Sequence, residues 1–247
     1  MKTLVIDIGN SLTKVAVFDG DNILFVEKSP NLNSAYVNSI VQEYHIQKTI
    51  ISSVLVKNAD GLSALAKKRN FLWFNSQTKL PISNLYLSPE TLGLDRLAGV
   101  VGAKKLYENN PVLVIDAGTC ITYDYTDKCG QYFGGSISPG IQMRLNALHE
   151  QTGKLPLVPF DENFTSSFGV NTQQSILSGV INGILGEAKA FIEHYVSLNA
   201  DLKIILCGGN ARFFDTRFKN SIFAHHIINE PNLVLIGLNT IVNFQND

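Results

Sequence analysis

Two short motifs in the sequence place a carboxylate and a glycine directly after an apolar run. Asp7-Ile8-Gly9-Asn10 follows Leu-Val-Ile, and Asp116-Ala117-Gly118-Thr119 follows Val-Leu-Val-Ile. Glycine lets a backbone approach a phosphate closely, and the N–H groups after it can donate to phosphate oxygens. A carboxylate repels a phosphate, so it is useful there only by holding a cation or the waters of that cation. One such motif is weak evidence, but two copies indicate phosphate binding assisted by a cation.

Other nucleotide-binding motifs are absent from the sequence. No Gly-x-Gly-x-x-Gly is present, so a Rossmann dinucleotide site is unsupported. Gly153-Lys154 is the one Gly-Lys pair, and Leu148 stands where a P-loop needs its first glycine. A pair of glycines, Gly208-Gly209, follows a later apolar strand and adds a further turn suited to a nucleotide.

The two carboxylate motifs belong to an internal repeat. Residues 3–28 and 112–134 each read as an apolar strand, Asp-x-Gly, a strand alternating through Thr, a polar turn and a third strand. Asp7 and Asp116 lie 109 residues apart. This spacing predicts two similar α/β domains in tandem, over 1–110 and 111–247, with phosphates held from both sides of a cleft between them.

The remaining pattern predicts the elements that position these motifs. Helical spacing covers 34–48, 60–69, 96–107 and 173–196, and apolar strands are predicted at 49–54 and 202–206. Asp95 is predicted to be the N-cap of the helix over 96–107. Residues 153–172 have no clear period and are predicted to form a loop near a site. The segment from Leu233 is predicted to be a last helix that packs back on the core.

Composition and charge indicate which classes of protein this sequence fits. The 247 residues are 45% hydrophobic and 17% charged, which is ordinary for a globular chain. Twenty basic against 21 acidic residues give a net charge of −1, which argues against binding to nucleic acid through phosphate neutralisation. Cys120, Cys129 and Cys207 form no C-x-x-C pair, so neither a disulfide framework nor a zinc site is expected. With no uninterrupted apolar run of about 18 residues and no secretory pattern at the start, we expect a cytoplasmic protein that does not enter a membrane.

Several motifs together resemble those of the type III pantothenate kinases, a family in the actin, hexokinase and Hsp70-like superfamily. The resemblance covers nearly the whole chain. Its motifs are Asp7-Ile8-Gly9-Asn10-Ser11-Leu12-Thr13-Lys14, Leu92-Gly93-Leu94-Asp95-Arg96 with Tyr86 before it, Asp116-Ala117-Gly118-Thr119 with Thr122, Gly134 to Gly140 with Leu155-Pro156, Gly169-Val170-Asn171-Thr172, and Gly208-Gly209.

This resemblance implies both a fold and a reaction. The fold would be α/β, with two tandem ribonuclease-H-like (actin-like ATPase) domains, mixed sheets and a nucleotide cleft between the domains. The reaction would be the ATP-dependent phosphorylation of pantothenate to 4'-phosphopantothenate, the first step of coenzyme A biosynthesis. The family also implies Mg²⁺, a monovalent cation (K⁺ or NH₄⁺), and a homodimer that completes the substrate site.

The resemblance further implies a role for each matching residue. Asp95 would be the catalytic proton acceptor, and Asp116 would bind the monovalent cation. Pantothenate would contact Tyr86, Gly93, Leu94, Asp95, Arg96 and Thr172. ATP would contact Asp7, Ile8, Gly9, Asn10, Ser11, Leu12, Thr13, Lys14 and Thr119. Phosphoryl transfer has a loose transition state, so alignment and charge neutralisation matter more than a strong base.

Simpler structural interpretations stand beside these roles. Asp95 could be only a helix cap, and Thr172 a loop residue or the cap of the following helix. Lys14 could face solvent from its strand, and the Tyr86 ring could serve packing alone. The histidines have no ligand spacing with cysteines or carboxylates.

Three other functions remain open from the sequence. A kinase for another small alcohol would need a different acceptor pocket from the one that Tyr86, Asp95, Arg96 and Thr172 suggest. A regulatory protein on the same fold, such as an accessory factor for transcription, would not need Asp95 and Asp116. An actin-like assembly or chaperone module would need a longer chain than this one.

Overall fold

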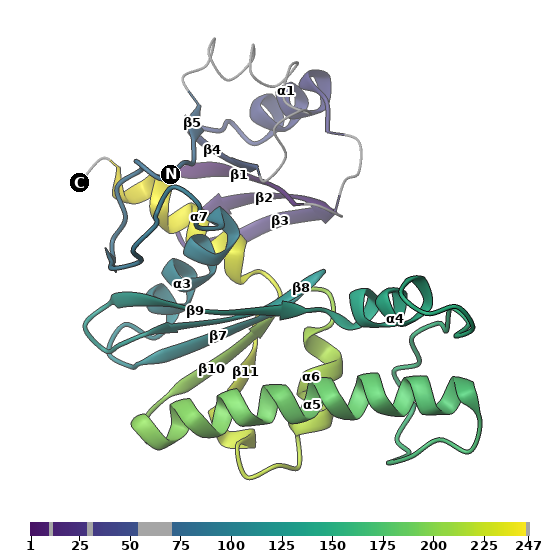
Figure 1. Ribbon diagram of the computed structural model, residues 1–247. Helices are drawn as coiled ribbons and strands as arrows, with labels where there is room; N and C mark the ends of the chain where they lie inside the picture. The colour runs from purple at the N-terminus through teal and green to yellow at the C-terminus, as the bar shows by residue number, and fades with distance from the viewer. Residues whose placement is uncertain (10–11, 29–31, 54–70, 246–247) are drawn as a thin grey trace. The chain divides into compact units, whose positions relative to one another are not determined.

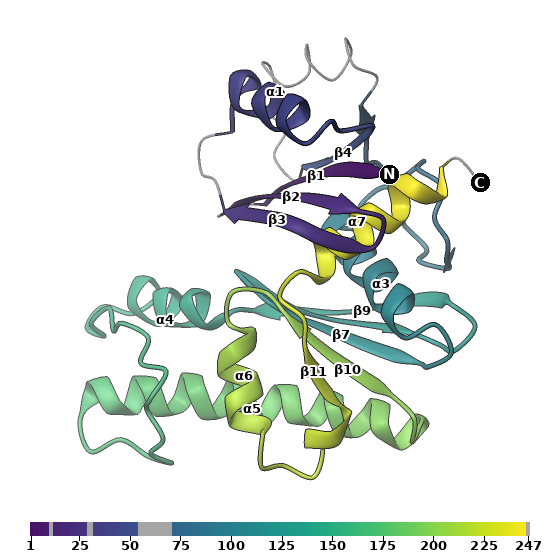
Figure 2. The same cartoon turned by 180° about the vertical axis from the view of Figure 1, so that it is seen from behind.

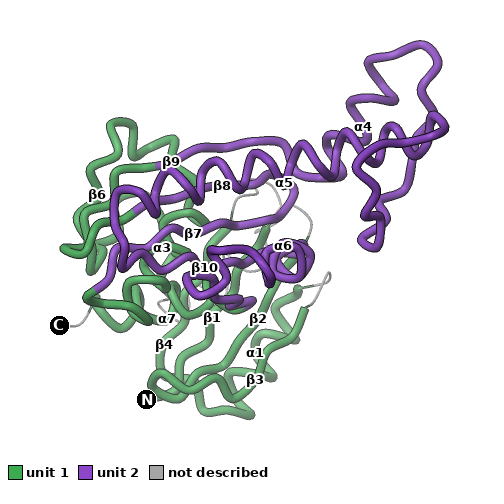
Figure 3. Tube along the Cα trace, turned by 90° about the horizontal axis from the view of Figure 1, so that it is seen from below, with its two compact units in different colours: residues 1–109, 126–134, 232–247 green, residues 110–125, 135–231 purple. Residues whose placement is uncertain are grey.

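The computed structural model describes residues 1–9, 12–28, 32–53 and 71–245 (Figure 1). Asn10, Ser11 and the helix predicted over 60–69 lie outside the described residues. The chain divides into two compact units, coloured in Figure 3. Unit 1 comprises Met1–Asn109, Thr126–Gly134 and Asn232–Asp247, and unit 2 comprises Asn110–Tyr125 and Gly135–Pro231. The predicted domains over 1–110 and 111–247, and the cleft between them, stay predictions.

Unit 1 contains a five-stranded mixed sheet in the order β3-β2-β1-β4-β5. The strands are β1 (Lys2–Ile8), β2 (Thr13–Asp19), β3 (Asn22–Lys28), β4 (Lys48–Ser53) and β5 (Leu72–Trp73). The first three are antiparallel, whereas β4 and β5 run parallel to β1. Leu4, Val5 and Ile6 of the central strand are fully buried, as expected for a strand covered on both faces.

Three helices accompany this sheet: α1 (Ser34–Glu43), α3 (Leu94–Leu106) and α7 (Leu233–Phe244). In Figures 1 and 2, α1 lies on one face of the sheet and α7 on the other. Val37, Ile40 and Val41 of α1 join the apolar side chains of β1, β2 and β4 in one core. The sheet and α1 therefore hold β1 in a packed core.

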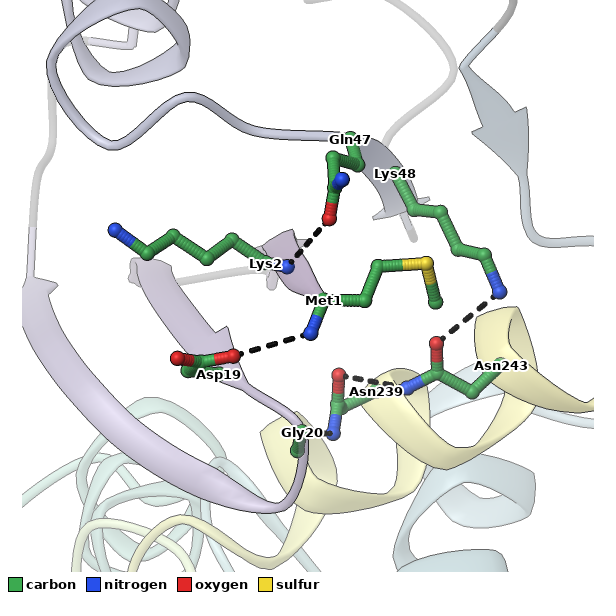
Figure 4. Close-up of polar contacts among 8 residues, drawn as sticks. All are labelled: Met1, Lys2, Asp19, Gly20, Gln47, Lys48, Asn239 and Asn243. Atoms are coloured by element: carbon green, nitrogen blue, oxygen red, sulfur yellow. Dashed lines mark hydrogen bonds and ion pairs between the residues drawn. The ribbon is translucent and has the colours of Figure 1, made fainter.

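Polar contacts fasten the beginning of β1 to its neighbours (Figure 4). The Met1 ammonium group lies 3.1 Å from Asp19 Oδ1 at the end of β2, and the Lys2 N–H donates to Gln47 Oε1 at 3.0 Å. These contacts hold β1 in register between β2 and the segment that leads into β4.

The last helix, α7, is fastened to the same region (Figure 4). The Asn239 side chain donates to the Gly20 carbonyl oxygen at 2.9 Å and accepts from the Asn243 side chain at 3.2 Å. Asn243 Oδ1 in turn accepts from Lys48 Nζ at 3.3 Å. A helix begins at Leu233 as predicted, and it packs on the unit that contains β1.

A second mixed sheet has six strands in the order β11-β10-β7-β8-β9-β6. Its strands are β6 (Ser83–Asn84), β7 (Val112–Ala117), β8 (Cys120–Thr126), β9 (Gln131–Pro139), β10 (Lys203–Cys207) and β11 (Ile227–Asn229). Strands β7, β10 and β11 are parallel, so the carboxyl ends of β7 and β10 meet at one edge. In the register, Cys207 of β10 lies beside Asp116 of β7.

Unit 2 contains three helices: α4 (Ile141–Glu150), α5 (Thr172–Leu198) and α6 (Ala211–Phe218). In Figure 1, α5 and α6 lie on one side of the sheet, and α4 follows the end of β9. A short 3-10 helix, η1, spans Ala224–His226. Side chains from α4, α5 and α6 form one core with the inner face of β7 and β8, including Leu113, Ile115, Ile121 and Ile184. This core supports the turn between β7 and β8.

Helix α5 is the one described helix that is long and apolar enough to cross a membrane by length and composition. Ile176, Val180, Ile181, Ile184 and Ile192 of this helix belong to the core of unit 2. The apolar spacing that predicts the helix is therefore explained by packing against the sheet.

The predicted α/β class with mixed sheets and the predicted strand repeat are confirmed. Two boundaries are corrected. The helix predicted over 34–48 ends at Glu43, because His45 has a positive φ of 55° and β4 begins at Lys48. Asp95 is not the N-cap of its helix: α3 begins at Leu94 with Gly93 at the N-cap, and Asp95 lies in the first turn.

Candidate active site

The second carboxylate motif forms the turn between β7 and β8. Asp116 lies near the end of β7 and is half-buried, whereas Thr119 at the tip of the turn is exposed. The Gly118 N–H donates to the Cys120 carbonyl oxygen at 2.9 Å, which closes the turn. The carboxylate and the exposed hydroxyl therefore belong to one short and well-supported loop.

Gly208 brings the turn after β10 against Asp116. Its φ of +89° lies in the left-handed region, which L side chains rarely adopt. A Cβ on this residue would stand 2.3 Å from Asp116 Oδ1. The Asn210 N–H then donates to the Ala117 carbonyl oxygen at 2.9 Å. Any other residue at position 208 would place its Cβ against this carboxylate.

The N-terminus of α4 packs against the other side of the same turn. The N–H of Gly140, the N-cap residue, donates to the Thr119 carbonyl oxygen at 3.1 Å. A Cβ on Gly140 would stand 2.3 Å from that oxygen and 2.6 Å from the Gly118 carbonyl oxygen. The position of Gly118-Thr119 thus depends on where α4 begins.

A polar cluster that sequence reasoning missed lies behind this junction. The Glu187 carboxylate of α5 accepts from Arg144 Nη2 at 2.6 Å, Ser138 Oγ at 2.5 Å and the Tyr123 hydroxyl at 3.0 Å. Burial would raise the pKa of the Glu187 carboxyl, but the hydrogen bonds from Arg144 and Ser138 hold that pKa below its ordinary value. The carboxylate is therefore charged and strongly coordinated by protein donors.

The sequence did carry one signal for this cluster. Glu187 stands three residues after the buried Ile184 and directly before the buried Ala188, within the apolar stripe of a long helix. A carboxylate on such a stripe needs a partner, because an unpaired buried charge is costly. The sequence could not identify Arg144 as that partner.

The first carboxylate motif forms the corresponding turn between β1 and β2 in unit 1. The Gly9 N–H donates to the Leu12 carbonyl oxygen at 3.1 Å, and Asp7 lies opposite Lys14 in the antiparallel register. Asp7 and Lys14 are half-buried, Leu12 is exposed, and the side chains of Ile8 and Thr13 are buried. Asp7 and Lys14 thus bring a carboxylate and an ammonium group to paired positions of β1 and β2.

The predicted acceptor residues come together at the start of α3 in unit 1. Asp95 Oδ1 accepts from the Arg96 N–H at 2.9 Å. Arg96 is buried, and its guanidinium carbon lies 5.7 Å from the centre of the Tyr86 ring. The Tyr86 ring stacks on Tyr132, with centroids 6.4 Å apart. The structure thus joins Tyr86, Asp95 and Arg96 although the first two are nine positions apart in the sequence.

Thr172, the remaining predicted substrate residue, lies in unit 2. It is the first residue of α5 and is exposed, while Asn171 caps the helix by accepting from the Gln174 N–H at 2.9 Å. A cavity of about 710 Å³ between α4 and α5 is lined by Thr172 together with Arg144, Leu148, Ile176 and Gly179. The alternative that Thr172 itself caps α5 is therefore wrong.

The predicted site residues thus fall into groups within each unit. Unit 1 contains the Asp7 turn and the cluster of Tyr86, Asp95 and Arg96, and unit 2 contains Asp116, Thr119 and Thr172. Among the residues that the structure describes, no group of three or more His, Cys, Asp or Glu side chains could hold a metal ion.

Comparison with known proteins identifies the family to which this chain belongs. The model of the type III pantothenate kinase family matches residues 3–194. A type III pantothenate kinase from Bacteroides fragilis is 43% identical over 244 residues, which cover 98% of each chain. The chain belongs to the type III pantothenate kinase family.

Solved structures agree with this family at the level of the fold. A protein from Campylobacter jejuni, proposed to be a Baf family transcriptional activator, aligns with a TM-score of 0.62 over 98% of both chains at 22% identity. The activator of the 2-hydroxyisocaproyl-CoA dehydratase from Clostridium difficile aligns with a TM-score of 0.54 over 99% of this chain and 94% of its own, at 11% identity. Both likenesses show the fold alone, and that fold is the actin-like ATPase type.

Proposed function

We propose that this chain transfers the γ-phosphoryl group of ATP to the primary hydroxyl of pantothenate and forms 4'-phosphopantothenate for coenzyme A biosynthesis. The observation that carries the proposal is 43% identity to a type III pantothenate kinase over 98% of both chains. In this reaction the hydroxyl oxygen forms a bond to the γ-phosphorus, the bond from that phosphorus to the β–γ bridging oxygen breaks, and ADP leaves.

Asp95 is the proposed proton acceptor. Its Oδ1 is oriented by the Arg96 N–H at 2.9 Å, which leaves Oδ2 for the acceptor hydroxyl. A loose phosphoryl-transfer transition state needs the proton removed only late, so an ordinary carboxylate is a sufficient base.

Beside Asp95, pantothenate is proposed to bind to Arg96, Tyr86, Gly93 and Leu94, and Thr172 is proposed as a further contact. The Arg96 guanidinium suits the substrate carboxylate because it is planar, permanently charged and able to donate two parallel N–H bonds.

ATP is proposed to bind to both carboxylate turns through Asp7, Ile8, Gly9, Asn10, Ser11, Leu12, Thr13, Lys14 and Thr119. Backbone N–H groups in these turns would donate to phosphate oxygens, and Lys14 would add a positive charge. Mg²⁺ would be held through its waters by Asp7.

A monovalent cation, K⁺ or NH₄⁺, is proposed to bind at Asp116. Asp116 is half-buried near the end of β7, and the backbone of Gly208 lies against its Oδ1, so this carboxylate is held in place by the turn after β10. When bound, such a cation adds positive charge that offsets the negative charge of the phosphates. We further propose that the chain acts as a homodimer in the cytoplasm.

The proposal is tested by measuring ADP release with purified protein, with and without pantothenate, in potassium and then in sodium buffer. We expect turnover that requires both pantothenate and potassium. Turnover on a different alcohol, or nucleotide binding without turnover, would instead favour another acceptor or a regulatory role.

The role of Asp95 is tested by Asp95→Asn. We expect kcat to fall by about 10²–10⁴-fold, the usual contribution of a general base, while ADP still binds. The melting temperature should stay close to that of the parent, since the amide can still accept the Arg96 N–H. A variant that keeps most of its kcat would remove Asp95 from the role of base.

A further inference from the structure

The ion pair of Glu187 and Arg144 ties the start of α4 to the rest of unit 2. Arg144 Nε donates to the Pro139 carbonyl oxygen at 2.8 Å, and the Arg144 N–H donates to the Gly140 carbonyl oxygen at 3.1 Å. The Arg144 side chain thus connects the first turn of α4 to the end of β9. Its guanidinium is in turn held by Glu187, one element away on α5.

Glu187 collects donors from three separate elements. Tyr123 comes from β8, Ser138 from the end of β9 and Arg144 from α4, while Glu187 itself projects from α5. The Arg144 and Glu187 side chains are 22% and 26% exposed, so water competes weakly for these bonds. The carboxylate therefore fixes the relative position of four elements at one point.

This cluster is connected to the Gly118-Thr119 turn between β7 and β8 through Gly140. Ser138 and Arg144 flank Pro139 and Gly140, and Gly140 contacts the carbonyl oxygens of Gly118 and Thr119. A shift of α4 along its axis would therefore move Gly140 against or away from Thr119, with no soft side chain between them to absorb the shift.

We infer that Glu187 and Arg144 are positioning residues for nucleotide binding: they hold the start of α4 against the Gly118-Thr119 turn and so place its donors for the phosphates of ATP. The inference rests on the proposed function for the identity of the ligand. It assigns to these two side chains a role that neither carboxylate motif reveals, and it requires no contact between them and the nucleotide.

The charge on Glu187 is essential to this role. Glutamine has nearly the same shape, but its amide nitrogen cannot accept from Arg144, Ser138 or Tyr123. The Arg144 guanidinium would then be left in a half-enclosed place without a counter-ion, which disfavours its present position.

The test compares Glu187→Gln, Arg144→Gln and the double variant in the full-length chain. The dissociation constant of Mg-ADP is measured by calorimetry in potassium buffer, together with KM for ATP, KM for pantothenate and the melting temperature. We expect the Mg-ADP dissociation constant and KM for ATP to rise, by up to about 100-fold, the cost of a misplacement of about 1 Å. For Glu187→Gln, whose side chain does not line the cavity beside Thr172, we expect KM for pantothenate to change less than KM for ATP.

The double variant separates positioning from simple loss of two side chains. Both residues act through one ion pair. We therefore expect the double variant to bind Mg-ADP no less tightly than the single variant with the lower Mg-ADP affinity. Additive losses in the double variant would overturn the proposal.

Two controls address stability. Glu193→Gln breaks the exposed Lys189–Glu193 pair on the same helix, whose atoms lie 3.6 Å apart, and should leave every measured value unchanged. Ile192→Val removes a methyl group from the core of the same helix and should lower the melting temperature without changing Mg-ADP affinity. A Glu187→Gln variant that loses melting temperature but keeps Mg-ADP affinity would show a structural role only and overturn the inference.

The readouts also separate this inference from the proposed function. If the parent chain binds Mg-ADP but does not turn over pantothenate, the proposed acceptor is wrong while the affinities of the variants still decide the positioning role. If the parent turns over pantothenate and the variants bind Mg-ADP as the parent does, only the positioning role fails.

Discussion

At the scale of single residues, the turn that contains Asp116 requires a residue without a side chain at position 208. Asp116 can lie against the turn after β10 only because Gly208 has no side chain, and Gly208 can adopt its φ of +89° for the same reason. The carboxylate and the glycine are 92 positions apart in the sequence, and the parallel pairing of β7 with β10 brings them together.

Replacing Gly208 tests this dependence. Gly208→Ala should lower the free energy of unfolding by about 1–2 kcal/mol from the left-handed conformation alone, and the contact with Asp116 adds to that loss. Equilibrium urea unfolding measures the change. Gly209→Ala is the matched control: a Cβ there meets nothing within 4 Å, so its unfolding free energy should stay within about 0.5 kcal/mol of the parent. Equal losses in the two variants would contradict this account.

At the scale of an element, the start of α5 separates a structural residue from a proposed binding residue. The Asn171 side chain accepts from the backbone N–H of Gln174, and the Gln174 side chain accepts from the backbone N–H of Val170 at 3.1 Å, so two backbone donors at the start of the helix are satisfied. Thr172 lies between them, exposed and outside this arrangement.

The two neighbours should therefore respond differently to alanine. Asn171→Ala should lower the free energy of unfolding by about 1 kcal/mol, because the helix loses its N-cap. Thr172→Ala should leave stability within about 0.5 kcal/mol and raise KM for pantothenate, if the hydroxyl binds the substrate. Thermal unfolding and steady-state kinetics on both variants give the four values. Loss of stability in Thr172→Ala with no change in KM would contradict the assignment.

At the scale of the whole molecule, the chain returns at its end to the unit in which it began. Unit 1 contains Met1–Asn109 and also Asn232–Asp247, and α7 contributes Asn239 to the turn between β2 and β3. Asn239 is 2% exposed, so its side-chain amide depends on its two protein partners, Gly20 and Asn243, for its hydrogen bonds.

Asn239→Ala should consequently destabilise the protein. The Gly20 carbonyl oxygen and the Asn243 amide, which are only partly buried, would each lose a partner, and two such hydrogen bonds together contribute about 1–3 kcal/mol. Urea unfolding should show this loss, whereas Asn220→Ala, at an exposed position of unit 2, should change the unfolding free energy by less than about 0.5 kcal/mol. A result for Asn239→Ala equal to that control would mean that α7 is held by its apolar face alone.

Local patterns in the sequence were sufficient for the strands, the repeat and the long buried helix. Apolar alternation and helical spacing depend on which residues a segment must bury, and this is written along the segment itself. The same reasoning misplaced the ends of elements. Asp95 is a good capping residue by type, yet Gly93 is the N-cap of α3, because the backbone enters the helix two residues earlier than the capping preference suggests.

What the sequence determined by itself is the family, the α/β class and the two Asp-x-Gly turns, because each follows from residues adjacent in the chain. What only the tertiary structure decided is how residues distant in sequence meet: Gly208 beside Asp116, the Arg96 guanidinium over the Tyr86 ring, and Glu187 with Arg144, Ser138 and Tyr123. Strand pairing and helix packing bring these groups together. A carboxylate on an apolar stripe shows that a partner must exist, but only the fold shows which residue it is.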